Sequence, residues 1–496
     1  MNWFVRNLLW VHLAALIVAF SWIEGGTRAD LLLPVIPWLS AFVLEWLLVF
    51  PQAKSAETLA EARLRVWRSL ARDPLTYIAL VFFVVLLMPL FNVAQAPVFD
   101  VAHNVWKNFA PPVRWLPSCV DPSGHAVLLL WFPPALVGAL AARHGLLKKS
   151  KRALLEFVCW NSAALSVLGF VQIGMGTNKI LGLTPMEGYF FSTFGYPNFA
   201  GAFFTLSTAL SLGVWLQMVS DKLGASLGTS ASAHEDDSWL WVNRLLVPMA
   251  FNFLGALGSL SRAAILLSGL VLLTISLYGF LCLWKNLSSG FRVTLVASVF
   301  AIVMIVVASF AIFKFDGLKH EINDISYSAI VQRVSGKGLY HARIAKEIFR
   351  DHPVFGVGGW GYPMYQLQYL TPEDKNNMQI GGGANVHNDT LQFLAEQGTV
   401  GFGLILLSAL CLIIPVLVQA VRLSFAKIAS NSDAETSTKV SGWRRVPLVL
   451  TCVIIGAGAT VCHSLGDLPF RDPAVLLIWT LSWICVLGWV PTVKRA

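Results

Sequence analysis

The chain has 496 residues, of which 56% are hydrophobic and 13% are charged, and its mean hydropathy is +0.66. A soluble domain typically carries about 25% charged residues, so this composition excludes an ordinary soluble enzyme and indicates an integral membrane protein. The formal net charge of +9 gives little reason to propose nucleic-acid binding, because the basic residues lie mainly between apolar stretches.

Apolar stretches near the length of about 20 residues that spans a bilayer recur along the chain. They predict about twelve membrane helices, at 8–23, 31–51, 75–93, 125–142, 153–173, 199–219, 245–261, 263–284, 293–313, 399–421, 447–463 and 473–491. Arg262 is the one charged residue between 245 and 284, so we expect two helices that turn at this arginine. The sequence therefore predicts an all-α membrane protein with nine helices in 1–313, a long loop at 314–398 and three helices in 399–496.

The distribution of Lys and Arg predicts the orientation of these helices. An even number of crossings puts both termini on one side, and placing them in the cytoplasm gives that side 22 basic residues. The short loops of the opposite side then carry six, while the loop 314–398 is too long to obey the rule. We therefore expect cytoplasmic termini and an external long loop. Basic clusters such as 148–152 are chiefly topology signals, with contact to lipid head groups as a further use.

Polar residues gather in four of the predicted external segments, at 187–201, 258–264, 314–398 and 463–473. The predicted helices offer few ionisable residues near the bilayer midplane, where ion-coupled transporters usually carry them. Loops that face one compartment can build one site at the membrane surface. This distribution favours an enzyme over a transporter.

The long loop has its own predicted structure. Segments 325–334 and 338–351 have helical spacing, and the second ends before Pro353, as expected ahead of a proline. The sequence GVGGWG at 356–361 matches G-x-G-x-x-G in form, but it lacks the strand and helix that a dinucleotide site requires. We therefore expect a turn there.

The stretch ANVHNDTLQFLAEQGTVG, residues 384–401, predicts a short helix. Asp389 suits the N-cap, Gln392 can complete a capping pair, and Gly398 suits the C-terminal stop. His387 should then lie just before the helix, whose positive end disfavours a protonated imidazole. A neutral imidazole suits a general base, although an exposed loop histidine, taken alone, is more often just a solvated side chain.

The residues 387–401 resemble the signature of the O-antigen ligase and polymerase superfamily, which are membrane glycosyltransferases that use undecaprenyl-diphosphate-linked glycans. Further segments resemble other motifs of this family in the expected order: FSTFGYPNFA at 191–200, SRAA at 261–264, DHPVFGVG at 351–358 and HSLGD at 463–467. One position departs from the pattern, because Gly338 stands where members often carry an arginine.

The resemblance implies a GT-C-like membrane glycosyltransferase fold, no cofactor, and metal-independent transfer with inversion at the sugar. No Asp-x-Asp metal motif occurs in the external loops, so arginines are the expected diphosphate ligands. The expected roles are His387 as catalytic residue, Arg262 with Arg343 or Arg333 on the diphosphate, and Asn198, Asn388, Glu396, His463 and Asp467 as residues that shape the site. Arg262 as a membrane-interface anchor and Glu396 as a loop anchor are the alternatives.

The function that follows is transfer of a glycan en bloc from undecaprenyl diphosphate to an acceptor hydroxyl on the periplasmic face of the bacterial inner membrane. We favour a ligase acting on lipid A-core. An O-antigen or exopolysaccharide polymerase and a protein O-oligosaccharyltransferase share the chemistry and differ in the acceptor. A flippase for lipid-linked oligosaccharides is the rival from another class, and a structural membrane scaffold is the third.

Overall fold

The computed structural model describes residues 3–226, 241–283, 337–371, 385–425 and 446–490. The chain divides into two compact units. Unit 1 comprises Met1–Gly145, Ile322–Cys411 and Val461–Leu477, and unit 2 comprises Leu146–Glu321, Leu412–Thr460 and Ile478–Ala496. Both units are therefore built from segments that lie far apart in the sequence.

The described residues are mainly helical. Unit 1 holds α1 (Trp3–Trp22), η1 (Glu24–Gly26), α2 (Ala29–Leu32), α3 (Ile36–Val49), α4 (Leu59–Leu70), α5 (Pro74–Leu87), η2 (Met88–Phe91), β1 (Val98–Asp100), β2 (Val105–Lys107), α6 (Pro122–Leu140), the π-helical η3 (Ala141–Gly145), α15 (Lys337–Asp351), α16 (Tyr362–Tyr365), η5 (Gln366–Tyr369) and η7 (Pro469–Arg471). Unit 2 holds α7 (Lys148–Gly174), β3 (Lys179–Ile180), β4 (Thr184–Pro185), α8 (Pro197–Ser226), α10 (Leu246–Gly258), α11 (Arg262–Leu283) and η8 (Val486–Gly488). Three helices contribute to both units: α18 (Asp389–Phe425), α19 (Leu448–Ser464) and α20 (Pro473–Cys485).

The predicted class of an all-α membrane protein agrees with these elements. Each predicted apolar stretch within the described residues contains a helix, and the stretch 293–313 lies outside them. Among the described residues, 6 helices are long and apolar enough to cross a membrane, and further apolar helices are shorter. The strands form two antiparallel hairpins, β1–β2 and β3–β4. The number of about twelve crossings stays a prediction.

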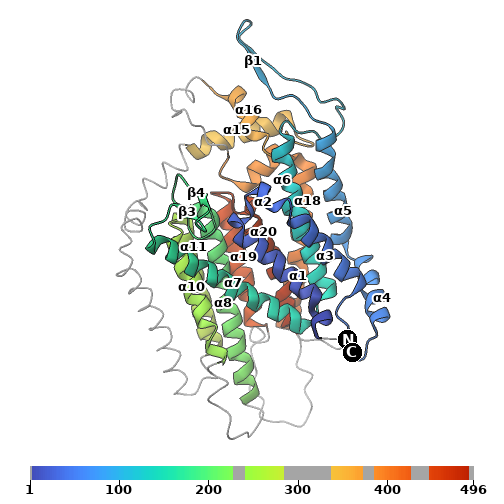
Figure 1. Cartoon of the computed structure of the whole chain (residues 1–496), viewed down its shortest axis with the longest axis vertical. Coiled ribbons are helices and arrows are strands. Elements are labelled where there is room, and N and C mark those ends of the chain that lie inside the picture. The colour runs from blue at the N-terminus through green and yellow to red at the C-terminus, as the bar shows by residue number, and fades with distance from the viewer. Residues whose placement is uncertain (1–2, 227–240, 284–336, 372–384, 426–445, 491–496) are drawn as a thin grey trace. The chain divides into compact units, whose positions relative to one another are not determined.

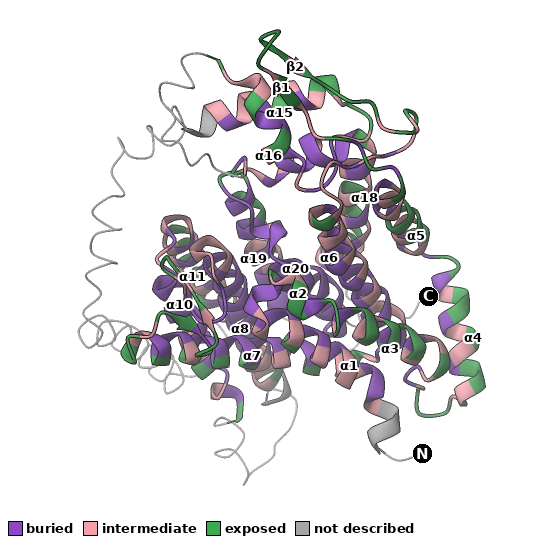
Figure 2. Cartoon of the chain, turned by 45° about the horizontal axis from the view of Figure 1, so that its top comes forward, coloured by how far each residue is buried: buried purple, intermediate pink, exposed green. Residues whose placement is uncertain are grey.

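Helix α8 is the core of unit 2, where it packs against α7, α10 and α11. Figure 2 shows it almost entirely in the colour of buried residues. Two buried hydroxyls on α8 bond within the helix, namely Thr208 to the carbonyl of Phe204 at 2.7 Å and Ser211 to the carbonyl of Ser207 at 2.8 Å. Asn252 of α10 donates to the hydroxyl of Ser211 at 2.9 Å and to the carbonyl of Cys159 on α7 at 3.2 Å. Small and polar residues thus join three apolar helices, as is common in membrane bundles.

Unit 1 is arranged around α6, which packs against α3 and α5. Helices α15 and α16 and the β1–β2 hairpin lie at one end of these helices, and α4 lies at the other (Figure 1). Helix α15 was predicted from its spacing, and its observed end at Asp351 confirms the stop before Pro353. The predicted segment 325–334 lies outside the described residues.

Helix α18 is interrupted at Gly398, where φ is 61° and ψ is −167°. The helix end at this glycine and the helix that follows from 399 were both predicted. Residues 353–358, which we call the splint, satisfy the backbone groups on both sides. The N–H groups of Val357 and Gly358 donate to the carbonyls of Ala395 and Glu396 at 3.1 and 2.8 Å.

On the other side of the break, the splint supplies acceptors. The N–H groups of Thr399 and Val400 donate to the carbonyls of Pro353 and Val354 at 2.8 and 3.0 Å. An interrupted helix leaves its terminal N–H and C=O groups without partners inside the helix. The splint supplies those partners, so two distant motifs of the sequence form one piece of structure.

Pro415 produces a second irregularity in α18. Because proline has no N–H, the carbonyl of Cys411 four residues earlier loses its helical donor. Arg143, which follows α6, donates to this carbonyl through Nη2 at 2.7 Å and to Asp73 through Nη1 at 2.7 Å. His144 reaches the same carboxylate at 2.8 Å. A charged group from another helix thus replaces the missing donor.

We predict that Gly398→Ala destabilises the protein by about 2 kcal/mol or more, because the backbone conformation there is open essentially to glycine alone. A Cβ at this position would also lie 2.4 Å from the carbonyl oxygen of Val354. The measurement is thermal unfolding of the full chain in detergent. Gly403→Ala is the matched control in the same helix, because a Cβ there meets nothing within 4 Å. Equal unfolding temperatures for the two variants would contradict the prediction.

Candidate functional site

His387 lies directly before α18, as predicted, with φ of 55° and 46% of its side chain exposed. The cap of the helix is Asn388, whose Oδ1 accepts from the N–H of Leu391 at 3.0 Å. The prediction of Asp389 as the cap is wrong by one residue, because that carboxylate instead accepts from the N–H of Phe470 at 3.0 Å. The helix start thereby gains a partner from a segment far along the chain.

A chain of buried contacts leads to the backbone beside His387. The N–H of Val386 donates to Oε1 of Gln392 at 2.6 Å, and Nε2 of Gln392 donates to Oε1 of Glu396 at 2.7 Å. Arg471 donates to the same Glu396 oxygen at 3.2 Å, and its guanidinium lies 4.0 Å from the centre of the Trp360 ring. Glu396 and Arg471 are 1% and 4% exposed. Glu396 is therefore a buried anchor, not a group on the open surface.

The segment after α19 brings a carboxylate to His387. Oδ1 of Asp467 lies 3.7 Å from Nδ1 of His387, longer than a direct hydrogen bond but within the range of an ion pair. Asn388 donates to the carbonyl of Leu465 in the same segment at 2.9 Å. Burial raises the pKa of Asp467, but the facing rings of His387 and His463 lower it by more, so its net pKa lies below the ordinary value. Asp467 is therefore a carboxylate near neutral pH.

His463, the other predicted histidine, is buried in the last turn of α19 and is 3% exposed. Neither of its ring nitrogens has a hydrogen-bond partner among the described residues. Buried polar groups normally have partners, and ordered water can supply them. His463 therefore faces Asp467 from the interior of unit 1, while His387 faces it from the exposed side.

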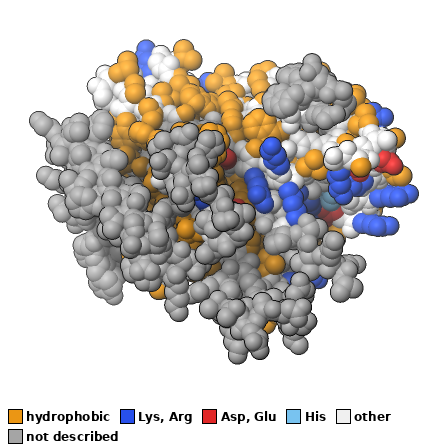
Figure 3. All heavy atoms as spheres, turned by 90° about the horizontal axis from the view of Figure 1, so that it is seen from below, with side chains coloured by type: hydrophobic (Ala, Val, Ile, Leu, Met, Phe, Trp, Pro, Cys, Tyr) orange, Lys and Arg blue, Asp and Glu red, His pale blue; other side chains and the backbone are white. Residues whose placement is uncertain are grey.

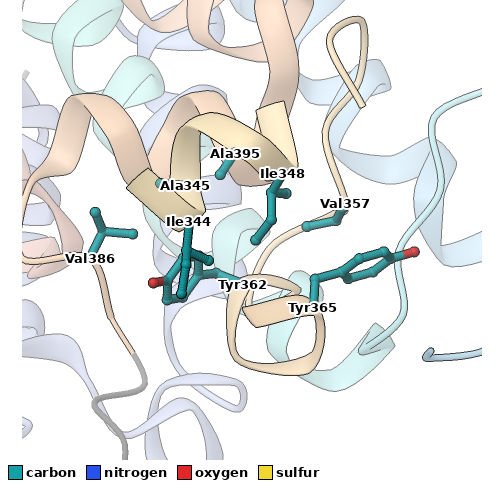
Figure 4. Packing of buried hydrophobic residues seen from close by; sticks show 8 residues of the cluster. All are labelled: Ile344, Ala345, Ile348, Val357, Tyr362, Tyr365, Val386 and Ala395. Atoms are coloured by element: carbon teal, nitrogen blue, oxygen red, sulfur yellow. The ribbon is translucent and has the colours of Figure 1, made fainter. Parts of the chain in front are cut away.

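His341 on α15 flanks His387 on another side, with 6.4 Å between the ring centroids. It is buried, and its Nδ1 lies 2.9 Å from the hydroxyl of Tyr362. The pair sits beside the hydrophobic cluster of α15 and α16, which Figure 4 shows around Ile344 and Ile348. Sequence reasoning missed His341, although its spacing of three and seven residues from these isoleucines places it on the inward face of the helix.

The structure describes one of the two arginines that were predicted to bind diphosphate from the long loop. Arg343 lies on α15, half-buried, and both of its terminal nitrogens lie 3.2 Å from the carbonyl of Tyr369. These contacts orient the guanidinium toward the segment after α16. Arg333 lies outside the described residues.

Asn198 and Arg262 belong to unit 2, in the first turns of α8 and α11. Asn198 donates to the hydroxyl of Tyr196 at 2.9 Å. Arg262 stands at the turn between α10 and α11, as predicted. A Cβ on Gly201 would lie 2.5 Å from the Cβ of Ala264, so this glycine lets the start of α8 pack closely against that turn. The two motifs that were far apart in the sequence are neighbours.

The described residues contain no group of three or more His, Cys, Asp and Glu side chains that could hold a metal ion. In unit 1 the predicted residues His387, Asn388, Glu396, His463 and Asp467 all lie in or beside the start of α18 and the end of α19. Their central feature is one half-exposed imidazole with a carboxylate facing its Nδ1. Such a pair can accept a proton at Nε2 and stabilise the resulting cation.

The comparison with curated proteins found no match. Residues 247–406, about a third of the chain, match the family described as O-antigen ligase. The matched part runs from α10 through α11, α15 and the splint into α18, and it includes Arg262, Arg343 and His387. It therefore covers the break at Gly398 and the half-exposed histidine on which the site is centred, and this part of the chain is similar to the O-antigen ligase family.

Proposed function

We propose that the protein transfers a glycan en bloc from undecaprenyl diphosphate to an acceptor hydroxyl on the periplasmic face of the inner membrane, with lipid A-core as the acceptor. The observation that carries the proposal is His387, half-exposed at a capped helix start, with Asp467 at 3.7 Å from its Nδ1. It lies within the segment that matches the O-antigen ligase family, whose members are membrane glycosyltransferase-like ligases and polymerases.

In the proposed reaction, Nε2 of His387 accepts the proton of the acceptor hydroxyl while the hydroxyl oxygen attacks the anomeric carbon of the donor sugar. The bond from that carbon to the diphosphate oxygen breaks, undecaprenyl diphosphate leaves with the electron pair, and the anomeric configuration inverts. Asp467 holds Nδ1 and stabilises the imidazolium as it forms, which is the role that an orienting carboxylate has in other catalytic histidine pairs. Asn388 keeps His387 in place through its cap and its contact with Leu465.

The leaving diphosphate needs cations or hydrogen-bond donors for its developing charge. We assign this role to Arg262, with Arg343 or Arg333 from the long loop. The guanidinium of Arg343 already donates to the carbonyl of Tyr369, so diphosphate binding would add to or replace those contacts. Arg262 is the stronger candidate for binding the diphosphate, because a tight turn at the end of a membrane helix presents its planar guanidinium close to the lipid head groups.

The orientation rests on the basic residues. Lys and Arg side chains gather on the right-hand part of the face seen from below in Figure 3, where α4 lies in Figure 1. Helix α4 itself carries Arg63, Arg65 and Arg68. Because basic residues favour the cytoplasmic side, we assign α15, the splint and His387 to the periplasmic side. In this orientation both termini lie in the cytoplasm.

We expect purified protein in lipid, with EDTA present, to shift lipid A-core in mass when undecaprenyl-diphosphate-linked glycan is supplied. His387→Ala should lower the rate by about 100-fold or more, because a general base contributes about 10²–10⁴. His103→Ala is the matched control, since His103 is 74% exposed on the β1–β2 hairpin. A longer donor-linked glycan formed without lipid A-core would indicate a polymerase. Full transfer by His387→Ala at equal membrane abundance would exclude the catalytic role.

We expect Asp467→Asn to lower kcat by about tenfold to hundredfold with a smaller change in KM, because the carboxylate acts on the imidazolium that forms during the reaction. The variant keeps the shape of the side chain, so its unfolding temperature should stay close to that of the wild type. The measurement is the initial transfer rate over a range of acceptor concentrations. An unchanged kcat would remove Asp467 from the mechanism.

We expect Arg262→Lys to lower transfer about tenfold, because lysine keeps the charge but loses the planar fork that binds two phosphate oxygens. The effect should be on the donor, so kcat/KM for undecaprenyl-diphosphate-linked glycan is the quantity to measure. Arg350→Lys is the control, because Arg350 is 69% exposed on α15. Equal values for both variants would support a membrane-interface anchor at Arg262 instead.

A further inference from the structure

A cavity of about 420 Å³ lies in unit 1, away from His387. One wall is the connection between α5 and α6, residues 92–120, which we call the hairpin loop. The other wall is residues 352–357, most of which belong to the splint, together with Tyr365. The volume lies in the range of about 300–1,000 Å³ that is typical of small-molecule sites.

The wall formed by the hairpin loop is fixed at its base. Asn92 is buried, and its Nδ2 donates to the carbonyls of Val113, Leu116 and Pro117 at 2.9, 3.2 and 3.1 Å. Its Oδ1 accepts from the N–H of Val113 at 3.0 Å. A Cβ on Gly358 would lie 2.5 Å from the Cβ of Cys119, so the splint and the hairpin loop are in close contact below the cavity. The cavity is therefore built into the fold.

Among the described residues, the lining carries polar and aromatic groups and no Asp or Glu. Arg114, Asn108 and His352 supply donors, and Phe109, Phe355 and Tyr365 supply aromatic surface. Burial lowers the pKa of His352, so that Arg114 is the cation of the lining near neutral pH. In Figure 4 the hydroxyl of Tyr365 points away from the rest of the hydrophobic cluster. The centroids of the Tyr365 and His352 rings lie 5.1 Å apart.

These features point to an anionic and hydroxyl-rich ligand. An arginine with planar donors favours a carboxylate or phosphate group, and aromatic faces beside amide and hydroxyl groups suit a sugar ring. The described residues of the lining include no Asp or Glu, so none of them repels such an anion.

We propose that this cavity binds an anionic sugar unit of a glycan, as a subsite remote from the reacting bond. His341 on α15, beside His387, and His352 at the cavity, directly after the end of α15, are eleven residues apart. At a rise of about 1.5 Å per residue this is about 16 Å. The subsite therefore binds a sugar unit that is separated by several bonds from the glycosidic bond that is formed or broken. This inference rests on the proposed glycan transfer for the identity of the ligand.

The subsite adds a specificity-determining role to residues that are outside the candidate active site. Binding energy from remote parts of a substrate can be used in the transition state, so its loss lowers kcat/KM for long substrates and leaves short ones unaffected. Two substrates can supply the sugar, namely the glycan of the donor and the glycan of the acceptor. Their shared chemistry is an anionic saccharide, and the experiments separate the two.

The first test is saturation-transfer NMR on the full chain in lipid nanodiscs with trigalacturonate as the probe. We expect a signal for trigalacturonate, a signal at least about fivefold weaker for its methyl ester, and loss of the signal in Arg114→Ala. Lys107→Ala is the matched control, because Lys107 is a 55% exposed cation on the same loop outside the cavity. Equal signals from acid and ester, or from Arg114→Ala and wild type, would overturn the proposal. Complete displacement by equimolar inorganic phosphate would overturn the saccharide specificity.

The second test measures kcat/KM for wild type and Arg114→Ala with full-length and truncated glycans, first on the donor and then on the acceptor. A loss of about tenfold with one full-length substrate, absent with its truncated form, assigns the subsite to that substrate. A loss that is equal with every truncated form contradicts a remote subsite. Failure of all transfer would count against the proposed function, whereas the NMR experiment needs no activity and tests the cavity by itself.

Discussion

The break in α18 at Gly398 imposes the constraint on which the rest of the site depends. A helix that stops and restarts leaves carbonyls on one side and N–H groups on the other without helical partners. The splint satisfies both sets with its own backbone, from Pro353 to Gly358. Side chains on the splint contribute little to this, so the backbone geometry at two glycines decides whether the segments fit together. The close approach of Gly356, whose Cβ would lie 2.4 Å from the carbonyl carbon of Glu396, follows from the same requirement.

The interlocked segments fix the position of the buried pair between Glu396 and Arg471. Removing one partner of a buried ion pair typically costs about 3–5 kcal/mol, because the other charge is left in a poorly polarisable interior. The pair adds little net free energy of folding, because burying both charges is itself costly. Its main effect is to fix the positions of the two side chains relative to each other. Through Gln392 it reaches the N–H of Val386, next to His387. The backbone beside His387 is thereby linked, through Gln392 and Glu396, to Arg471 in a distant part of the chain.

The remote cavity and the candidate active site share the splint as a structural element. One face of the splint contacts α18, and the other lines the cavity beside Arg114 and Tyr365. The proposed subsite and the contacts with α18 therefore share one backbone segment. The splint carries no ionisable side chain between Pro353 and Gly358, so its contribution to both is to position other groups.

The sequence alone determined the class of the protein, most helix positions and the exposed histidine, because apolar length, prolines and helix-end residues act locally. The end of α15 before Pro353, the turn at Arg262 and the break at Gly398 all follow from such local rules. The tertiary structure decided which groups surround His387. The carboxyl group of Asp389 accepts from the N–H of Phe470, and Asn388 caps the helix in its place. Arg471 contacts Glu396 and His341 lies beside His387 because distant segments of the chain pack together. A single sequence carries no direct record of those contacts, since the partner of a buried polar group is set by how the chain folds back on itself.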